Sequence, residues 1–195
     1  ANMIEKIIFI LVNILYINTS AQENIISKIK NYSDIKLNEI LFVSVTNQKM
    51  YHIKDNIIIN KYIISTSEFG TGNKAGSNKT PIGMHKIKSK HGDKTPINGR
   101  MIGRVFNGEI SKIYTDKKKS KTDDITSRIF WLEGLEEGVN KGKNIDSFKR
   151  YIYIHGTSEE GRLGSPASHG CIRMKNKEVV DLYNKIEVGT LVLIL

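Results

Sequence analysis

The spacing of apolar residues along most of the chain is typical of β-strands. Apolar runs at residues 40–45, 50–53 and 57–64 are separated by turn-prone polar residues, Asn47-Gln48 and Asp55-Asn56. This pattern predicts two hairpins in succession. Further short strands are predicted at residues 84–87, 101–106, 129–132, 151–154 and 191–195.

Helical spacing is found in two segments. Residues 22–39 carry isoleucines at helical intervals among polar residues, which predicts an amphipathic helix that tethers the domain. Asn176 is a predicted N-cap for a second helix that continues through Ile186. Its inward face would comprise Val179, Val180, Leu182, Tyr183 and Ile186. We therefore expect a mainly β fold with one or two helices on a sheet or flattened barrel.

The N-terminal segment is the most apolar part of the chain. An apolar run over residues 7–17 follows Lys6 and is too short to span a bilayer comfortably. Thr19 and Ala21 have the small-residue spacing of a signal-peptidase site. We expect residues 1–21 to be a signal peptide, with the first two residues before Met3 a remnant of cloning. A buried helix or an uncleaved membrane anchor are the alternatives.

Charge separates this chain from an average domain. Its 195 residues suit one domain, and Lys+Arg 30 against Asp+Glu 20 gives a net charge of +10. Such a surface attracts polyanions, whether nucleic acid, anionic lipid or acidic wall polymers. Frequent Lys, Asn and Ile point to a coding bias that supplies part of this excess. No RNP, zinc-finger or helix-turn-helix pattern favours nucleic acid.

The single cysteine, Cys171, is the centre of the candidate chemistry. It excludes an internal disulfide framework and a zinc site of four thiolates. In an oxidising compartment an unpaired thiol is a liability unless its chemistry is used. His155 and His169 lie close enough in sequence for one of them to act as a base that raises the thiolate fraction.

His155 is the better candidate for a Cys-His pair, because it ends a predicted strand that a loop of about a dozen residues connects back to Cys171. A backbone carbonyl near Gly156 could hold the imidazole in one tautomer. The N–H groups of Gly170 and Cys171 could stabilise a developing oxyanion. Arg173 could pair with a substrate carboxylate or form an ordinary surface ion pair.

Two other interpretations of the polar motifs are weaker. His155, His169 and the thiol could supply three zinc ligands, but neither Glu159 nor Glu160 is clearly placed as the accompanying base. The Gly-rich residues 70–80 suggest a phosphate loop. Asn78 replaces the glycine that such a loop needs before its lysine, and a proline follows where a helix should begin. A third possibility is that the cysteine is merely a small buried residue.

The two polar motifs resemble a known family signature. Residues 168–173, Ser-His-Gly-Cys-Ile-Arg, together with the upstream His-Gly-Thr at 155–157, are similar to the signature of the L,D-transpeptidase (YkuD-type) catalytic domain. The strands over 41–64, Ser65-Thr66-Ser67 and Thr80-Pro81-Ile82-Gly83 resemble its N-terminal half. The resemblance covers residues 40–195.

The resemblance implies a mixed-sheet β-sandwich or flattened barrel and a cell-wall enzyme that uses no metal or other cofactor. The enzyme would be exported to the periplasm or cell wall, act on peptidoglycan stem peptides and be acylated by carbapenems. The implied roles are nucleophile for Cys171, general base for His155, second motif histidine for His169, orienting carbonyl for Gly156, oxyanion donors for Gly170 and Cys171, and substrate contacts for Ser168, Thr157 and Arg173.

In the implied reaction, the thiolate attacks the L-centred third residue of a tetrapeptide stem, D-alanine leaves, and an amine of a second stem resolves the thioester. Water as acceptor would make the enzyme an L,D-carboxypeptidase, and a lysine of an outer-membrane lipoprotein would make it an anchoring enzyme. A non-catalytic wall-binding domain is the alternative outside enzymes. The polar stretch 115–124 looks variable in the family, and the oligomeric state is left open.

Overall fold

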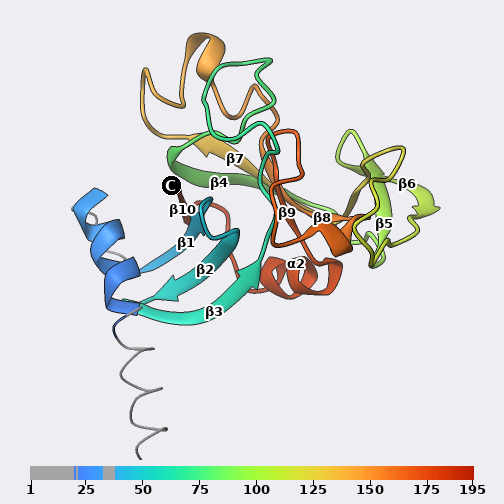
Figure 1. The fold of residues 1–195 in the computed structure, drawn as a ribbon, viewed down its shortest axis with the longest axis horizontal. Coiled ribbons are helices and arrows are strands. Elements are labelled where there is room, and N and C mark those ends of the chain that lie inside the picture. The colour runs from blue at the N-terminus through green and yellow to red at the C-terminus, as the bar shows by residue number, and fades with distance from the viewer. Residues whose placement is uncertain (1–19, 21, 33–37) are drawn as a thin grey trace, which may run out of the picture.

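Ten strands and two helices form the described part of the chain, which comprises residue 20, residues 22–32 and residues 38–195 of the computed structural model (Figure 1). Residues 22–32 are helical and α2 spans Asn176–Tyr183, with 3-10 turns at η1 (Lys143–Ile145) and η2 (Glu160–Arg162). The strands are β1 (Glu39–Ser44), β2 (Lys49–Lys54), β3 (Ile57–Ile63), β4 (Gly83–His91), β5 (Gly99–Ile102), β6 (Val105–Ile110), β7 (Ile125–Gly134), β8 (Tyr153–Thr157), β9 (Ile172–Met174) and β10 (Leu191–Ile194).

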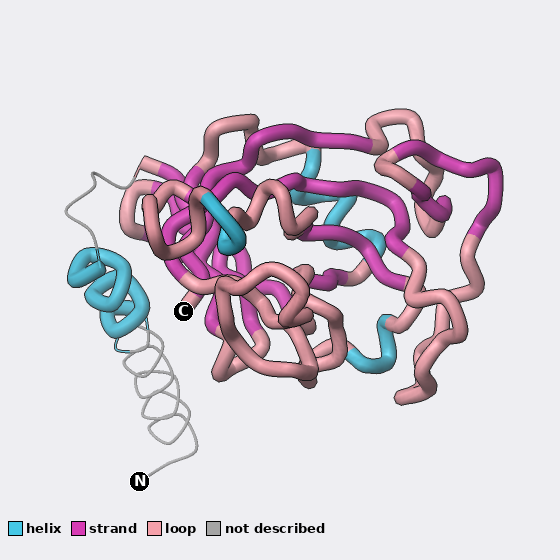
Figure 2. Tube along the Cα trace, turned by 90° about the horizontal axis from the view of Figure 1, so that it is seen from above, coloured by secondary structure: helices cyan, strands magenta, loops and turns pink. Residues whose placement is uncertain are grey.

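All ten strands belong to one mixed sheet. Its main order is β3-β2-β1-β10-β4-β7-β5-β6, and β8 branches from β7 to pair with β9. The pairs β1–β10 and β8–β9 are parallel and the others are antiparallel. The prediction of a mainly β, mixed-sheet domain is confirmed: Figure 2 shows mostly strands and loops in the described part of the chain. The sheet is open, and β3 and β6 are the two ends of its main strand order.

The residues of the turn explain the hairpin formed by β2 and β3. Asp55 and Asn56 form the two-residue connection between β2 and β3, with φ of 50° and 62°. Asp and Asn tolerate this left-handed region, which matches the twist of a tight hairpin. The two successive hairpins predicted from the sequence are confirmed.

The strand predicted at residues 101–106 was wrong, because the structure divides it into β5 and β6. Gly103 and Arg104 form the turn between them, with φ of 56° and 71°. Both central residues therefore take left-handed conformations, as a two-residue hairpin requires. The apolar character of the flanking residues hid this turn in the sequence pattern.

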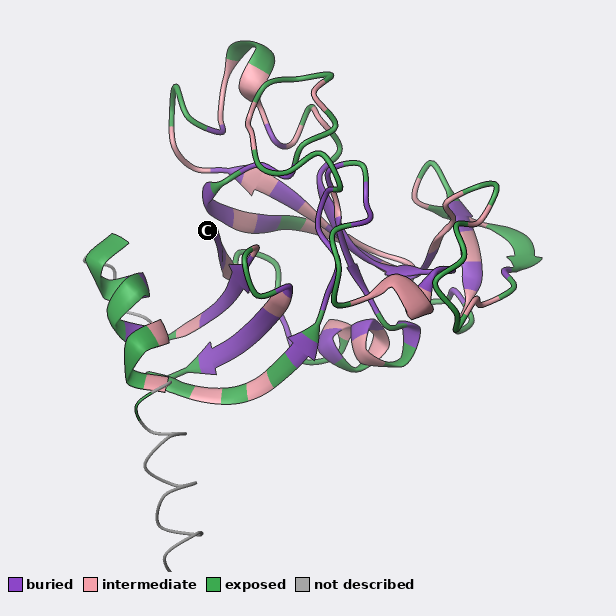
Figure 3. Cartoon of the chain, in the orientation of Figure 1, coloured by how far each residue is buried: buried purple, intermediate pink, exposed green. Residues whose placement is uncertain are grey.

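The two faces of β1 lie against different helices. Leu41 and Val43 pack in a core with α2, whereas Ile40 and Phe42 pack in a second core with the helix of residues 22–32. Adjacent residues of a strand point to opposite faces, so the helices cover opposite sides of the sheet. Figure 3 shows β1 and β2 mostly buried between them, while the edge strand β3 alternates in exposure.

The helix of residues 22–32 is packed onto the domain along its length. Ile26 and Ile29 are buried against the sheet, and the Tyr32 hydroxyl donates to Glu136 at 2.9 Å. The expected helical tether over 22–39 is thus docked in its described part. The expected signal peptide lies outside the described residues except for Ser20. None of the described helices has the length and apolar character needed to cross a bilayer.

Asn176 does not cap α2 as predicted, because its side chain is used elsewhere. The cap position is Lys175 and the helix ends at Tyr183 rather than Ile186. The Asn176 amide oxygen accepts from Thr126 Oγ1 at 2.6 Å, and its nitrogen donates to the Thr157 carbonyl at 2.8 Å. Asn176 therefore ties the start of α2 to β7 and β8.

Candidate active site

The two sequence motifs meet on neighbouring parallel strands. The register of β8 and β9 sets His155 opposite Arg173. Because side chains alternate between the faces of a strand, Cys171 points to the same side as His155. Both residues line one cavity of about 180 Å³, whose other lining residues are Asp123, Ile125, Ser168, His169 and Arg173.

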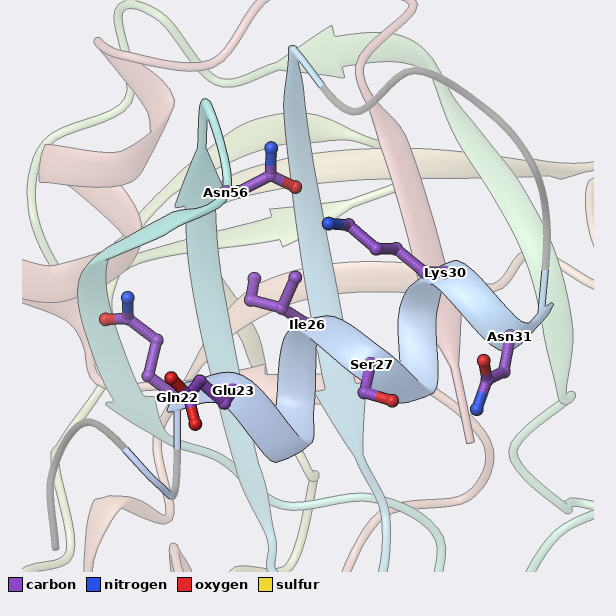
Figure 4. Close-up of a pocket in the computed structure, with 7 residues that line it drawn as sticks. All are labelled: Gln22, Glu23, Ile26, Ser27, Lys30, Asn31 and Asn56. Atoms are coloured by element: carbon purple, nitrogen blue, oxygen red, sulfur yellow. The ribbon is translucent and has the colours of Figure 1, made fainter.

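A larger cavity of about 330 Å³ lies along the N-terminal helix (Figure 4). It is bounded by that helix and the turn between β2 and β3, and its lining residues are Gln22, Glu23, Ile26, Ser27, Lys30, Asn31 and Asn56. This lining contains no thiol and no imidazole. The smaller cavity is therefore the candidate active site.

A backbone bond fixes the imidazole of His155. Its Nδ1 lies 2.7 Å from the Gly156 carbonyl oxygen, which can only accept a hydrogen bond. Nδ1 therefore carries the proton and Nε2 keeps its lone pair, as a general base requires. Gly156 is required sterically, because a Cβ there would lie 2.7 Å from the Thr126 carbonyl oxygen.

The sulfur of Cys171 contacts the segment that leads into β8. Its thiol donates to the Tyr151 carbonyl at 3.5 Å, and the Tyr153 N–H donates to Sγ at 3.4 Å. Tyr151 has a φ of 57°, a conformation that a bulky residue seldom adopts. This bend explains why β8 begins at Tyr153 rather than at Tyr151 as predicted.

Burial opposes charge on both reacting groups. It raises the pKa of the Cys171 thiol to about 11, although the hydrogen bond from the Tyr153 N–H lowers this pKa. It lowers the pKa of the His155 imidazole to about 4, although the hydrogen bond to the Gly156 carbonyl raises this pKa. Burial thus favours the neutral form of both groups, so the proton would pass to His155 as the sulfur attacks. The role of His155 as the base that ionises the sulfur stays a prediction.

We expect the thiol to remain protonated at neutral pH. The measurement is the far-ultraviolet thiolate absorbance of the wild-type protein minus that of Cys171→Ser, followed as the pH is raised. The difference band should be absent at neutral pH and should grow only as the pH approaches about 11. A full band at neutral pH would show a resting thiolate-imidazolium pair instead.

The loop before Cys171 is held by hydroxyl groups. Ser168 Oγ donates to the Cys171 carbonyl at 2.6 Å and accepts the Gly170 N–H at 3.3 Å. Thr80 Oγ1 donates to the Gly170 carbonyl at 3.0 Å. Gly170 has a φ of 127°, where a side chain would be strained. Its N–H is thus already engaged, which leaves the Cys171 N–H as the better oxyanion donor.

The match to known proteins covers most of the chain. The model of the L,D-transpeptidase catalytic domain, YkuD, matches residues 38–194. The chain belongs to this family. A 45-residue segment is 58% identical to "Putative L,D-transpeptidase YqjB" of Bacillus subtilis, covering 23% of this chain and 26% of that protein. The matched part thus spans about a quarter of that relative.

Solved structures agree with this L,D-transpeptidase domain in fold. L,D-transpeptidase 3 from Mycobacterium tuberculosis, in complex with a faropenem-derived adduct, is 14% identical with a TM-score of 0.50, and the match covers 80% of this chain and 60% of that one. The Ldtfm-avibactam carbamoyl enzyme is 17% identical with a TM-score of 0.50 over 83% and 49% of the two chains. At these identities the likeness concerns the fold alone.

Arg173 does not have the free guanidinium that the sequence suggested. In this L,D-transpeptidase domain the residue is 1% exposed. Its Nη1 donates to Glu159 at 2.8 Å and its Nη2 to Asp123 at 2.5 Å. Because both terminal nitrogens are paired within the protein, Arg173 forms the floor of the site rather than a contact for a substrate carboxylate.

Two of the expected substrate-contact residues are likewise occupied by the protein itself. Thr157 is fully buried, and its hydroxyl accepts the Glu159 N–H at 3.0 Å. Ser168 lines the cavity, but its hydroxyl is engaged by the loop. Both hydroxyls therefore hold the backbone around the L,D-transpeptidase site rather than contact a substrate.

Sequence reasoning missed the acidic residues around His169. Nδ1 of His169 lies 3.0 Å from Asp123 and Nε2 lies 3.5 Å from Glu68, with the ring 40% exposed. Burial disfavours the Asp123 carboxylate, but Arg173 and the histidines hold its pKa below the usual range. Asp123 lies near the end of the polar stretch 115–124, whose position the sequence left open. That stretch therefore supplies one wall of the cavity.

The described residues contain no group of three or more His, Cys, Asp or Glu side chains arranged to hold a metal ion. His169 is turned toward carboxylates on both sides.

Acid should destabilise this L,D-transpeptidase domain through two buried histidines. Burial lowers the pKa of His85 and of His155 to about 4. The unfolded chain therefore binds more protons as the pH falls from about 6.5 to about 4, and each histidine removes up to about 3 kcal/mol over that window. Above about 6.5 their contribution is constant.

Denaturant unfolding across this window measures the effect. His85 bonds to Ser147 Oγ at 2.9 Å, so His85→Gln keeps a polar group there. We expect this variant to lose less stability between neutral pH and about pH 4 than the wild type. An equal loss in both proteins would contradict the assignment.

Proposed function

We propose that the protein is a thiol-dependent peptidoglycan L,D-transpeptidase. The observation that supports this most is the shared cavity of Cys171 and His155, with Nδ1 of the histidine bonded to the Gly156 carbonyl. A nucleophile beside an oriented base is the arrangement required for acyl transfer. Family membership supports peptidoglycan stem peptides as the substrate class.

The reaction proceeds in two halves. His155 Nε2 takes the thiol proton as Cys171 attacks the carbonyl of the L-centred third stem residue. The C–N bond to D-alanine then breaks, the imidazolium returns its proton to the leaving amine, and a thioester remains. An amine of a second stem attacks the thioester, its proton passes through His155, and the thiol is released.

The acceptor and the site of action are also part of the proposal. An exported enzyme in the periplasm or cell wall would meet peptidoglycan, and its net charge of +10 suits anionic wall polymers. A second stem is the proposed acceptor. Water or a lipoprotein amine would use the same thioester and would leave different products.

Acylation tests the nucleophile directly. A carbapenem should add covalently to the intact protein, the adduct should map to Cys171, and Cys171→Ala should lose both adduct and turnover. Val188→Ala, at a 57% exposed position before β10, is the control and should react as wild type. An adduct on another residue would refute the assignment.

Mass spectrometry of muropeptides after incubation with purified sacculi tests the reaction. Cross-linked stems with loss of D-alanine are expected. Trimmed stems alone would identify a carboxypeptidase, and a stem joined to a protein lysine would identify an anchoring enzyme. Wall binding without any new muropeptide would overturn the enzymatic proposal.

A further inference from the structure

Arg150 lies in the turn before β8 and holds the Gly-rich loop over residues 70–80. Its Nη1 donates to the Gly72 carbonyl at 3.1 Å and its Nη2 to the Lys79 carbonyl at 2.6 Å. In Figure 1 this loop and the segment of η1 lie together above β4 and β7. Arg150 thus joins the turn before β8 to a loop that is distant in sequence.

The same guanidinium lies beside the nucleophile. The Lys79 oxygen that it binds is 3.4 Å from the position of a Cβ on Gly170, the residue before Cys171. The residue after Arg150 supplies the carbonyl that accepts the thiol.

Arg150 has no acidic partner among the residues that the structure describes. Arg162 and Arg173 by contrast each pair with carboxylates. Arg150 is partly buried, and burial lowers its pKa while the nearby Cys171 raises it. A guanidinium has five N–H donors, so two carbonyl bonds leave others free. Arg150 is therefore a cation without a carboxylate partner, close enough for its charge to act on the reacting sulfur and just outside the residues that line the cavity.

We propose that Arg150 binds the terminal carboxylate of the donor peptide. The inference rests on the proposed function, in which the bond broken lies one residue before the donor's end. Adjacent residues are about 3.8 Å apart, so a donor carbonyl at Cys171 places its last carboxylate close to the sulfur, within reach of Arg150. This is the task that the sequence assigned to Arg173. It makes the site selective for donors with a single residue beyond the bond that breaks.

Equilibrium binding to the Cys171→Ala protein tests this selectivity without turnover. The probes are a synthetic stem tetrapeptide that ends in D-alanine and the same peptide with a terminal carboxamide. In this background Arg150→Gln should weaken binding of the acid about tenfold to a hundredfold and change binding of the amide less than about threefold. Arg150→Lys should be intermediate, because it keeps the charge and loses the planar fork.

Lys149→Gln is the matched control, because it removes the same charge from an exposed neighbour and should leave both affinities unchanged. Equal weakening of acid and amide by Arg150→Gln would mean that Arg150 only holds the loop, and would overturn the proposal. Turnover by the Cys171-containing enzyme is measured separately. Discrimination in binding without turnover would support the carboxylate site and count against the transpeptidase function.

Discussion

Replacing His155 with glutamine should slow carbapenem acylation of Cys171 by about a hundredfold to ten-thousandfold, the range for loss of a general base. Burial raises the pKa of the thiol to about 11, so we expect attack to require a base at the moment of reaction. Glutamine can still hydrogen-bond in the cavity but cannot accept the proton. The rate is measured by intact mass against time at neutral pH.

His52→Gln is the matched control for this substitution. His52 is also buried, on β2, where it pairs with Glu39 at 2.8 Å, and it does not line the active-site cavity. Its acylation rate should stay within about threefold of the wild type, the effect of a change that spares the base. A similar slowing in both variants would indicate a general loss of structure and remove the support for His155 as base.

Replacing Arg173 with leucine should lower the free energy of unfolding by about 3 kcal/mol, at the lower end of the cost of breaking a buried ion pair. The side chain of Glu159 is fully buried and would lose the guanidinium 2.8 Å away. Arg162 still pairs with Glu159 at 2.8 Å, which limits the damage. Urea unfolding at neutral pH provides the measurement.

Arg162→Leu distinguishes a buried pair from charge removal in general. Its side chain is 17% exposed, and Glu159 would keep Arg173, so we expect a loss of about 1 kcal/mol, as for a partly exposed pair. The double variant Arg173→Leu with Glu159→Leu should recover much of the stability lost by Arg173→Leu alone. No recovery would show that the cost of losing Arg173 does not come from the stranded carboxylate.

Local chemistry in the sequence was enough for much of the fold. The hairpin at Asp55-Asn56 follows from the backbone preferences of two neighbouring residues, and strand periodicity locates most of the sheet. The division of 101–106 into two strands was missed because the spacing of apolar residues does not indicate that Arg104 has a φ of 71°. The role of Asn176 was missed because its partners on β7 and β8 lie far away in sequence.

The site was predictable where a short connection limits the geometry. About a dozen residues join β8 to Cys171, so the cysteine and His155 could be brought together from spacing alone. The environment of Arg173 was not predictable, because Asp123 comes from a different part of the chain. The pKa shifts of His155 and the sulfur were not predictable either, since they depend on burial of both groups in the folded cavity.

The buried pair of Arg173 and Glu159 has a consequence for the divergence of related sequences. A substitution at position 173 leaves the buried Glu159 carboxylate with Arg162 alone, and a substitution at position 159 leaves Arg173 with Asp123 alone. Each change weakens a buried network, so we expect changes at the two positions to occur together. Homologues with an uncharged residue at position 173 should more often lack the acidic residue at position 159, and the two alignment columns should covary.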